Sequence, residues 1–122
     1  MKLIQYSLIL ILVSCYQPNR HCSDFKVGQY KYEALVNGKL ETTLFKRNDS
    51  LQIEIYQGEA DTSKIRWIND CEFILTPINP ESILDQYQIH MKIISTTQNS
   101  YNFQYNVVGE KQKETGLAIK MD

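Results

Sequence analysis

Five carboxylates could in principle supply acid and base catalysis, namely Asp24, Asp49, Glu54, Asp70 and Glu72. Asp49 and Asp70 fall in expected turns, where an aspartate commonly hydrogen-bonds its own backbone. Glu54 falls in an expected strand, on a face from which it can pair with Lys64 or Arg66 across the strands. No serine or cysteine stands in the arrangement of a nucleophile beside its base. The sequence therefore predicts a protein that is not an enzyme, with no catalytic residue and no cofactor.

An apolar run near the start of the chain ends in Cys15. One positive charge at Lys2, the apolar stretch Leu3–Val13 of about eleven residues and then a small residue follow the order of a secretory signal. The run is too short for a membrane-spanning helix, which needs about 20 apolar residues. Leu12-Val13-Ser14-Cys15 resembles the lipobox of bacterial lipoproteins, in which the signal is cut before the cysteine and the thiol carries diacylglycerol. We therefore expect a signal peptide over residues 1–14 and lipid attachment at Cys15.

The two remaining cysteines, Cys22 and Cys71, form an even pair in a chain that we expect to reach an oxidising compartment. This pairing favours a disulfide between them. The alternative is a zinc site that also uses His21 and His90, but these cysteines and histidines lack the close spacing of paired zinc ligands. We therefore expect a disulfide and no metal.

Short segments rich in β-branched and aromatic residues recur after residue 24 and are separated by polar turns, which is typical of an all-β fold. We expect eight strands, at residues 25–33, 39–47, 51–57, 63–68, 71–77, 87–96, 100–108 and 115–121. Asn37-Gly38 favours a type I′ hairpin turn, and residues 79–86 favour one short helical connector. Without long crossovers, the strands predict an antiparallel meander that forms a small barrel or a strongly curved sheet.

Alternating side chains assign the faces of these strands. In the segment 51–56, the apolar residues Leu51, Ile53 and Ile55 predict the buried face, and the residues between them predict the solvent face. Trp67 and Cys71 share a face if Ile68-Asn69-Asp70 form a three-residue turn. We expect the interior of such a small domain to be filled by its own side chains rather than to hold a ligand.

An aromatic and charged group on neighbouring strands suggests a candidate binding surface, made of Glu54, Tyr56, Arg66 and Trp67. Exposed aromatic residues of this kind can anchor a partner, although a tryptophan in an alternating strand more commonly packs in the core. Asp49-Ser50-Leu51 matches a short acceptor for O-glycosylation, so Ser50 is a candidate modification site on a hairpin.

Three segments carry a resemblance to known sequences, namely residues 22–30, 47–54 and 65–76. They are similar to a family of small exported bacterial proteins of unknown function. Members share an early Cys with Phe-Lys-x-Gly, an R-x-D-S hairpin followed by Q-x-E, and a W-x-x-D-C-E-aromatic block. The resemblance implies a β-rich fold with a disulfide between Cys22 and Cys71, and it implies no activity. The chain after residue 78 departs most from the pattern.

The charge balance excludes one class of partner. Cleavage after residue 14 removes the single basic residue Lys2 and leaves a mature chain of 108 residues with 12 basic and 14 acidic side chains. A nucleic-acid binder would show a basic face or stripe. We therefore expect no nucleic-acid partner.

The sequence thus predicts a lipid-anchored domain of the cell envelope, with a tether at residues 15–24 and one β-domain at residues 25–122. We expect a monomer that contacts the membrane through the lipid on Cys15 and binds an envelope protein or a glycan. Tyr16 follows the anchor cysteine where some lineages carry an aspartate, which favours the periplasmic face of the outer membrane. The expected function is a non-enzymatic binding or interaction module. The alternative is a protein inhibitor of a cell-wall hydrolase, similar to lysozyme inhibitors.

Overall fold

A computed structural model of the chain describes residues 20–78 and 87–121. In this part of the chain, a short 3-10 helix precedes eight strands. The elements are η1 (Cys22–Phe25), β1 (Gly28–Val36), β2 (Lys39–Arg47), β3 (Leu51–Tyr56), β4 (Glu59–Asn69), β5 (Glu72–Pro77), β6 (Ile89–Thr96), β7 (Ser100–Val107) and β8 (Glu114–Met121). Lipid attachment at Cys15 and the helical connector expected at residues 79–86 lie outside the described residues.

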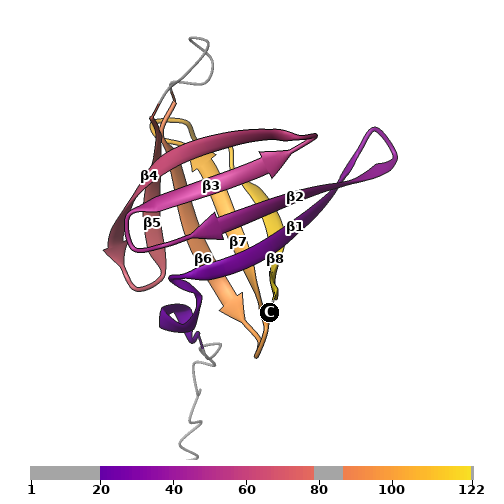
Figure 1. Cartoon of the computed structure of the whole chain (residues 1–122). Coiled ribbons are helices and arrows are strands. Elements are labelled where there is room, and N and C mark those ends of the chain that lie inside the picture. The colour runs from indigo at the N-terminus through magenta and orange to yellow at the C-terminus, as the bar shows by residue number, and fades with distance from the viewer. Residues whose placement is uncertain (1–19, 79–86, 122) are drawn as a thin grey trace, which may run out of the picture.

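The strands form a closed antiparallel barrel in which each strand pairs with its neighbour in sequence (Figure 1). The barrel closes because β1 also pairs with β8, where Gln29 lies opposite Met121 and Tyr32 lies opposite Ala118. The predicted all-β meander is therefore confirmed, and it is a barrel rather than an open sheet. No helix within the described residues is long and apolar enough to cross a membrane.

Two hairpins turn on a residue pair with positive φ. Asn37 and Gly38 have φ of 52° and 78°, as the predicted type I′ turn requires. Gln57 and Gly58 adopt the same region, with φ of 50° and 80°. This second tight turn replaces the longer loop that the sequence favours after residue 57, and β4 therefore begins four residues earlier than expected, at Glu59.

One end of the barrel is covered by η1, and we call it the closed end. Cys22 is buried there and forms a disulfide with Cys71 in the β4–β5 turn, so the predicted disulfide is confirmed. Phe25 inserts beside Tyr101, with ring centroids 5.2 Å apart. Cys22 and Phe25 therefore hold η1 against the barrel, at the end of the segment 15–24 that the sequence predicts as a tether.

The β4–β5 turn differs from the expected three-residue loop. Trp67 pairs with Phe73 and Asn69 pairs with Glu72, so the turn has two residues and the extra residue, Ile68, forms a bulge in β4. A bulge rotates the strand locally. It therefore lets Trp67 and Cys71 both pack against the core without the longer turn that the sequence predicts.

The face assignment of β3 is wrong. Gln52 is only 3% exposed, whereas Ile55 is 38% exposed, so the residues Gln52, Glu54 and Tyr56 follow the inner face. Polar residues are stable on this face because Arg47 lies buried beside Gln52 and bonds to it. In β7, the same alternation predicts that Tyr101 and Phe103 face the core, and both are buried.

The barrel interior has two halves. Near the closed end, the largest fully buried side chains pack together, namely Phe25, Tyr30, Phe73, Ile93 and Tyr101. Toward the other end, Gly116 of β8 leaves space on the inner face. An added Cβ at this position would lie 2.5 Å from Tyr32 and 2.6 Å from Phe103. The close approach of these two rings therefore depends on the missing side chain.

Candidate functional site

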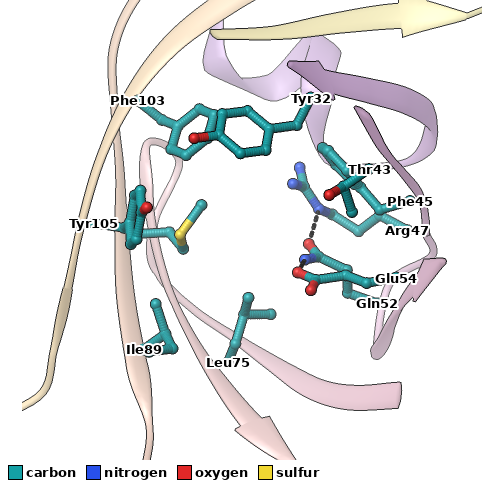
Figure 2. A pocket seen from close by; sticks show the side chains of 11 residues that line it. Tyr32, Thr43, Phe45, Arg47, Gln52, Glu54, Leu75, Ile89, Phe103 and Tyr105 are labelled. Carbon is teal, nitrogen blue, oxygen red and sulfur yellow. Dashed lines mark hydrogen bonds between the residues drawn. The ribbon is translucent and has the colours of Figure 1, made fainter. Parts of the chain in front are cut away.

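The half of the barrel away from η1 contains a solvent-accessible cavity of about 260 Å³, which we call the interior cavity (Figure 2). All its lining residues come from strands, and they are Tyr32, Thr43, Phe45, Arg47, Gln52, Glu54, Leu75, Ile89, Met91, Phe103 and Tyr105. The expectation of an interior filled by side chains is therefore wrong for this half. Thr43 contributes only a small side chain to this half, and the larger residues that face it across the barrel leave space between them.

Arg47 forms the deep polar wall of the interior cavity. Its Nε donates a hydrogen bond to Gln52 Oε1 at 3.0 Å, its Nη1 donates to the Phe25 carbonyl at 2.7 Å, and its Nη2 donates to Tyr101 Oη at 2.8 Å. The guanidinium carbon lies 4.6 Å from the ring centroid of Phe73. Hydrogen bonds and aromatic faces therefore stabilise a cation that is only 3% exposed.

Two hydrogen bonds connect the Arg47 cation, through the amide of Gln52, to the carboxylate of Glu54 in the open part of the interior cavity. Gln52 accepts from Arg47 and donates its own Nε2 hydrogen to Glu54 Oε1 at 2.9 Å. Figure 2 shows the three side chains side by side on one wall. Within the described residues, Arg47 forms no direct ion pair with a carboxylate, so its charge acts on Glu54 through space and through Gln52.

Glu54 keeps access to solvent, yet protein atoms replace much of the water around its carboxylate. This burial raises the pKa of Glu54 above its ordinary value. The Gln52 hydrogen bond opposes the rise, the negative charge of Asp61 adds to it, and the positive charge of Arg47 opposes it. The cavity wall therefore holds a carboxylate whose ionised form is disfavoured by its surroundings.

The facing wall is largely apolar. It consists of Leu75 from β5, Ile89 and Met91 from β6, and Phe103 and Tyr105 from β7. Burial, together with the charge and hydrogen bond of Tyr32, raises the pKa of Tyr105 to about 12. Tyr105 is thus a neutral hydroxyl at ordinary pH. The interior cavity has one polar wall and one apolar wall, a combination suited to a small amphipathic molecule.

The four residues of the expected binding surface do not lie on one surface. Glu54 lines the interior cavity, and Tyr56 lies further out on the same strand with 39% of its surface exposed. Trp67 lies at the closed end, 4.6 Å from the Phe73 ring and under the Lys26 ammonium at 5.2 Å. Arg66 is exposed between its inward-facing neighbours on β4, so the pairing of Glu54 with Lys64 or Arg66 expected from the sequence is wrong.

The other carboxylates are dispersed over the molecule. Asp70 pairs with Lys26 at 2.8 Å, and Glu72 lies 3.3 Å from His90. Asp24 and Asp49 are exposed. The described residues contain no group of three or more His, Cys, Asp or Glu side chains that could hold a metal ion.

The turn after β2 contains the candidate glycosylation site. Ser50 is exposed there, and its backbone N–H donates to Asn48 Oδ1 at 2.9 Å. Asn69 accepts a similar hydrogen bond from the backbone of Cys71 at 2.8 Å. The local backbone bonds expected of Asp49 and Asp70 are thus made by the asparagines that precede them.

Sequence reasoning did not identify Arg47 and Gln52, which organise the polar wall. Each lies at the edge of an expected strand, next to the turn of residues 48–50, where polar residues are usually solvent-exposed. One signal was present for Arg47: it alternates with Phe45 and Thr43 on a single face of its strand.

In comparisons with known proteins, no family model, no curated protein and no solved structure matches this chain. The interior cavity is therefore interpreted from its own chemistry.

Proposed function

We propose that this chain is a non-enzymatic binding module of the cell envelope, anchored by lipid at Cys15, that holds a small ligand in the interior cavity of its barrel. The observation that carries the proposal is the cavity itself, which has one polar and one apolar wall. Protein sites for small molecules usually combine apolar lining with a few polar groups that fix orientation.

The size of the interior cavity favours a small ligand. Its volume is about 260 Å³, and a water molecule occupies about 30 Å³ of the liquid. The ligand would then have roughly ten non-hydrogen atoms. A glycan chain or a protein segment would exceed this volume, so the proposed occupant is a compact molecule.

The path of the chain fits the proposed anchor. Arg20, the first described residue, lies at the closed end, where its Nη1 is 3.4 Å from the Ile93 carbonyl. Arg47 reaches η1 from the deep end of the cavity, whereas Glu54, Ile89 and Tyr105 lie further along their strands, away from η1. A lipid on Cys15 would therefore hold the closed end near the membrane and leave the cavity facing away from it.

A cavity-filling variant tests this function. Ile89→Phe adds atoms inside the interior cavity, whereas Ile94→Phe makes the same change on the same strand at a residue that is 37% exposed. We expect the wild type and the Ile94→Phe control to give ligand-detected NMR signals with small amphipathic molecules, and Ile89→Phe to lose them. If Ile89→Phe binds the same molecules as well as wild type, the cavity is not the site.

A further inference from the structure

The polar wall of the interior cavity presents a carboxylate to a ligand more readily than it presents its cation. Three of the five N–H groups of Arg47 already donate hydrogen bonds within the protein, and the side chain is only 3% exposed. Glu54 uses Oε1 to accept from Gln52. Within the described residues, its Oε2 accepts no hydrogen bond, and the side chain is reached by solvent. The charged atom available to an incoming ligand is therefore this oxygen.

Further carboxylates surround the way into the interior cavity. Asp61 lies directly opposite Glu54 in the β3–β4 pairing, and Glu114 lies directly opposite Tyr105 in the β7–β8 pairing. Glu41 lies two residues before Thr43 on the inner face of β2, nearer the open end. Among the described residues that line the cavity, Arg47 is the single base. These carboxylates lie close to Glu54, and together with it they favour a cation over an anion at this part of the cavity.

The remaining surface of the interior cavity suits a cation that carries an apolar body. Tyr32, Phe103 and Tyr105 form a connected aromatic wall, with ring centroids 5.4 Å and 5.8 Å apart along it. Aromatic faces attract ammonium groups, most strongly where water is excluded. Ile89 and Met91 extend this wall with aliphatic surface that an alkyl chain or a ring can cover.

We propose that the interior cavity binds a small amphipathic cation, with a primary or substituted ammonium group on Glu54 and an apolar body against Ile89, Met91 and Phe103. This ligand class rests on the proposed binding function and makes it specific. It excludes small carboxylates, which would meet Glu54 and the acidic residues around the opening before they reached Arg47.

The protonation state of Glu54 should make the affinity of the cavity for a cation depend on pH. The charged and titratable groups near its carboxylate are Asp61 on β4, Arg47 on β2, and Tyr101 and Tyr105 on β7. Burial raises the pKa of Glu54, and a bound ammonium group would favour the ionised form. Affinity for a cation should therefore rise as pH increases through this raised pKa. An alkylammonium ion keeps its own charge in this range, since an amine such as that of lysine has a pKa of about 10.4.

Three probes of equal chain length test the ligand class: n-hexylammonium, hexan-1-ol and hexanoate. Each is titrated by NMR into the full chain and into Glu54→Gln, which keeps an oxygen that can accept from Gln52. We expect hexylammonium to bind wild type about tenfold or more tightly than hexanol, as a hydrogen bond to a charged group predicts. Glu54→Gln should remove this advantage and leave hexanol binding unchanged. Glu33→Gln is the matched control, because Glu33 pairs with Lys31 on the outer face of β1.

The outcomes separate the two proposals. Equal or tighter binding of hexanol or hexanoate would overturn the cationic ligand class and leave the cavity as a binding site. Binding of none of the three would overturn both. Because Glu54→Gln could alter folding, the pH profile of wild type provides a second test. We expect hexylammonium affinity to rise with pH and hexanol affinity to stay constant. If hexylammonium affinity does not rise with pH, the assignment of Glu54 is overturned.

Discussion

Removal of the Cys22–Cys71 disulfide by the double substitution Cys22→Ala and Cys71→Ala should destabilise the domain strongly. The two cysteines are 49 residues apart in sequence, so the bridge closes a loop of about 50 residues. In the chain-entropy treatment, such a loop contributes about 4 kcal/mol by restricting the unfolded chain. A single domain is typically stable by about 5–15 kcal/mol. The loss would therefore take a large fraction of the free energy of unfolding.

Urea denaturation measures this loss. Trp67 is the single tryptophan of the chain, and it packs at the closed end beside the bridge, so its fluorescence reports unfolding there. With a denaturant slope of about 2 kcal/mol per molar urea, the unfolding midpoint should fall by about 2 M. Wild type treated with a thiol reductant should match the double variant, and the reductant should not change the double variant itself.

The contacts at the closed end also indicate how many unfolding transitions the double variant should show. The Phe25 carbonyl accepts a hydrogen bond from Arg47, and its ring is buried against Tyr101. These contacts join η1 to the barrel independently of the disulfide, so the double variant should still unfold in one transition. A destabilisation below about 1 kcal/mol, or a separate early transition for η1, would refute the claim that the disulfide stabilises the whole domain by restricting the unfolded chain.

Three further predictions concern other parts of the molecule. Gly116→Ala should lower the free energy of unfolding by about 1–3 kcal/mol, because the added Cβ collides with two rings of the cavity wall; thermal unfolding measures this, and an unchanged midpoint would contradict it. Burial raises the pKa of both Tyr30 and Tyr105 to about 12, above the ordinary value of 10, so the folded state holds these protons more tightly than the unfolded state. Stability should therefore be insensitive to these groups below about pH 10 and fall as pH rises toward 12, and ultraviolet titration that shows every tyrosine ionising near pH 10 in the folded protein would disprove it. Cys15→Ala should abolish labelling by radioactive fatty acid and release the protein from the membrane fraction, and continued retention without label would argue against the lipid anchor.

The strand positions could be predicted from the sequence because the alternation and the turns act locally. The ends of β2 and the start of β3 agree with expectation, since residues 48–50 favour a turn whatever lies around them. Asn37-Gly38 adopts the expected positive φ for the same reason. The disulfide was predictable as well, because the anchor motif leaves two cysteines with no other partner.

The inner face of β3 could not be predicted from its own residues. Its two faces differ clearly in polarity, and the usual rule buries the apolar one. The outcome is reversed because Arg47, on another strand, needs the acceptor of Gln52 inside the barrel. Similarly, the close packing of Tyr32 and Phe103 on the cavity wall depends on Gly116 of the neighbouring strand β8, which is paired directly with Phe103. Both features arise from contacts between strands, and a single-strand pattern contains no information about them.

The pairing of β1 with β8 places Met121 opposite Gln29, so the described chain enters and leaves the barrel at the same end. The other end carries the hairpins that join β1 to β2, β3 to β4 and β7 to β8. The tight turns at Asn37-Gly38 and Gln57-Gly58 belong to these hairpins, whereas the disulfide belongs to the opposite end. Substitution or lengthening of these hairpins could therefore alter which molecules enter, while the covalent bridge and the aromatic core that stabilise the fold stay unchanged. The barrel thus separates the residues available for changing specificity from those that maintain stability, which makes it a practical scaffold for engineering new receptors.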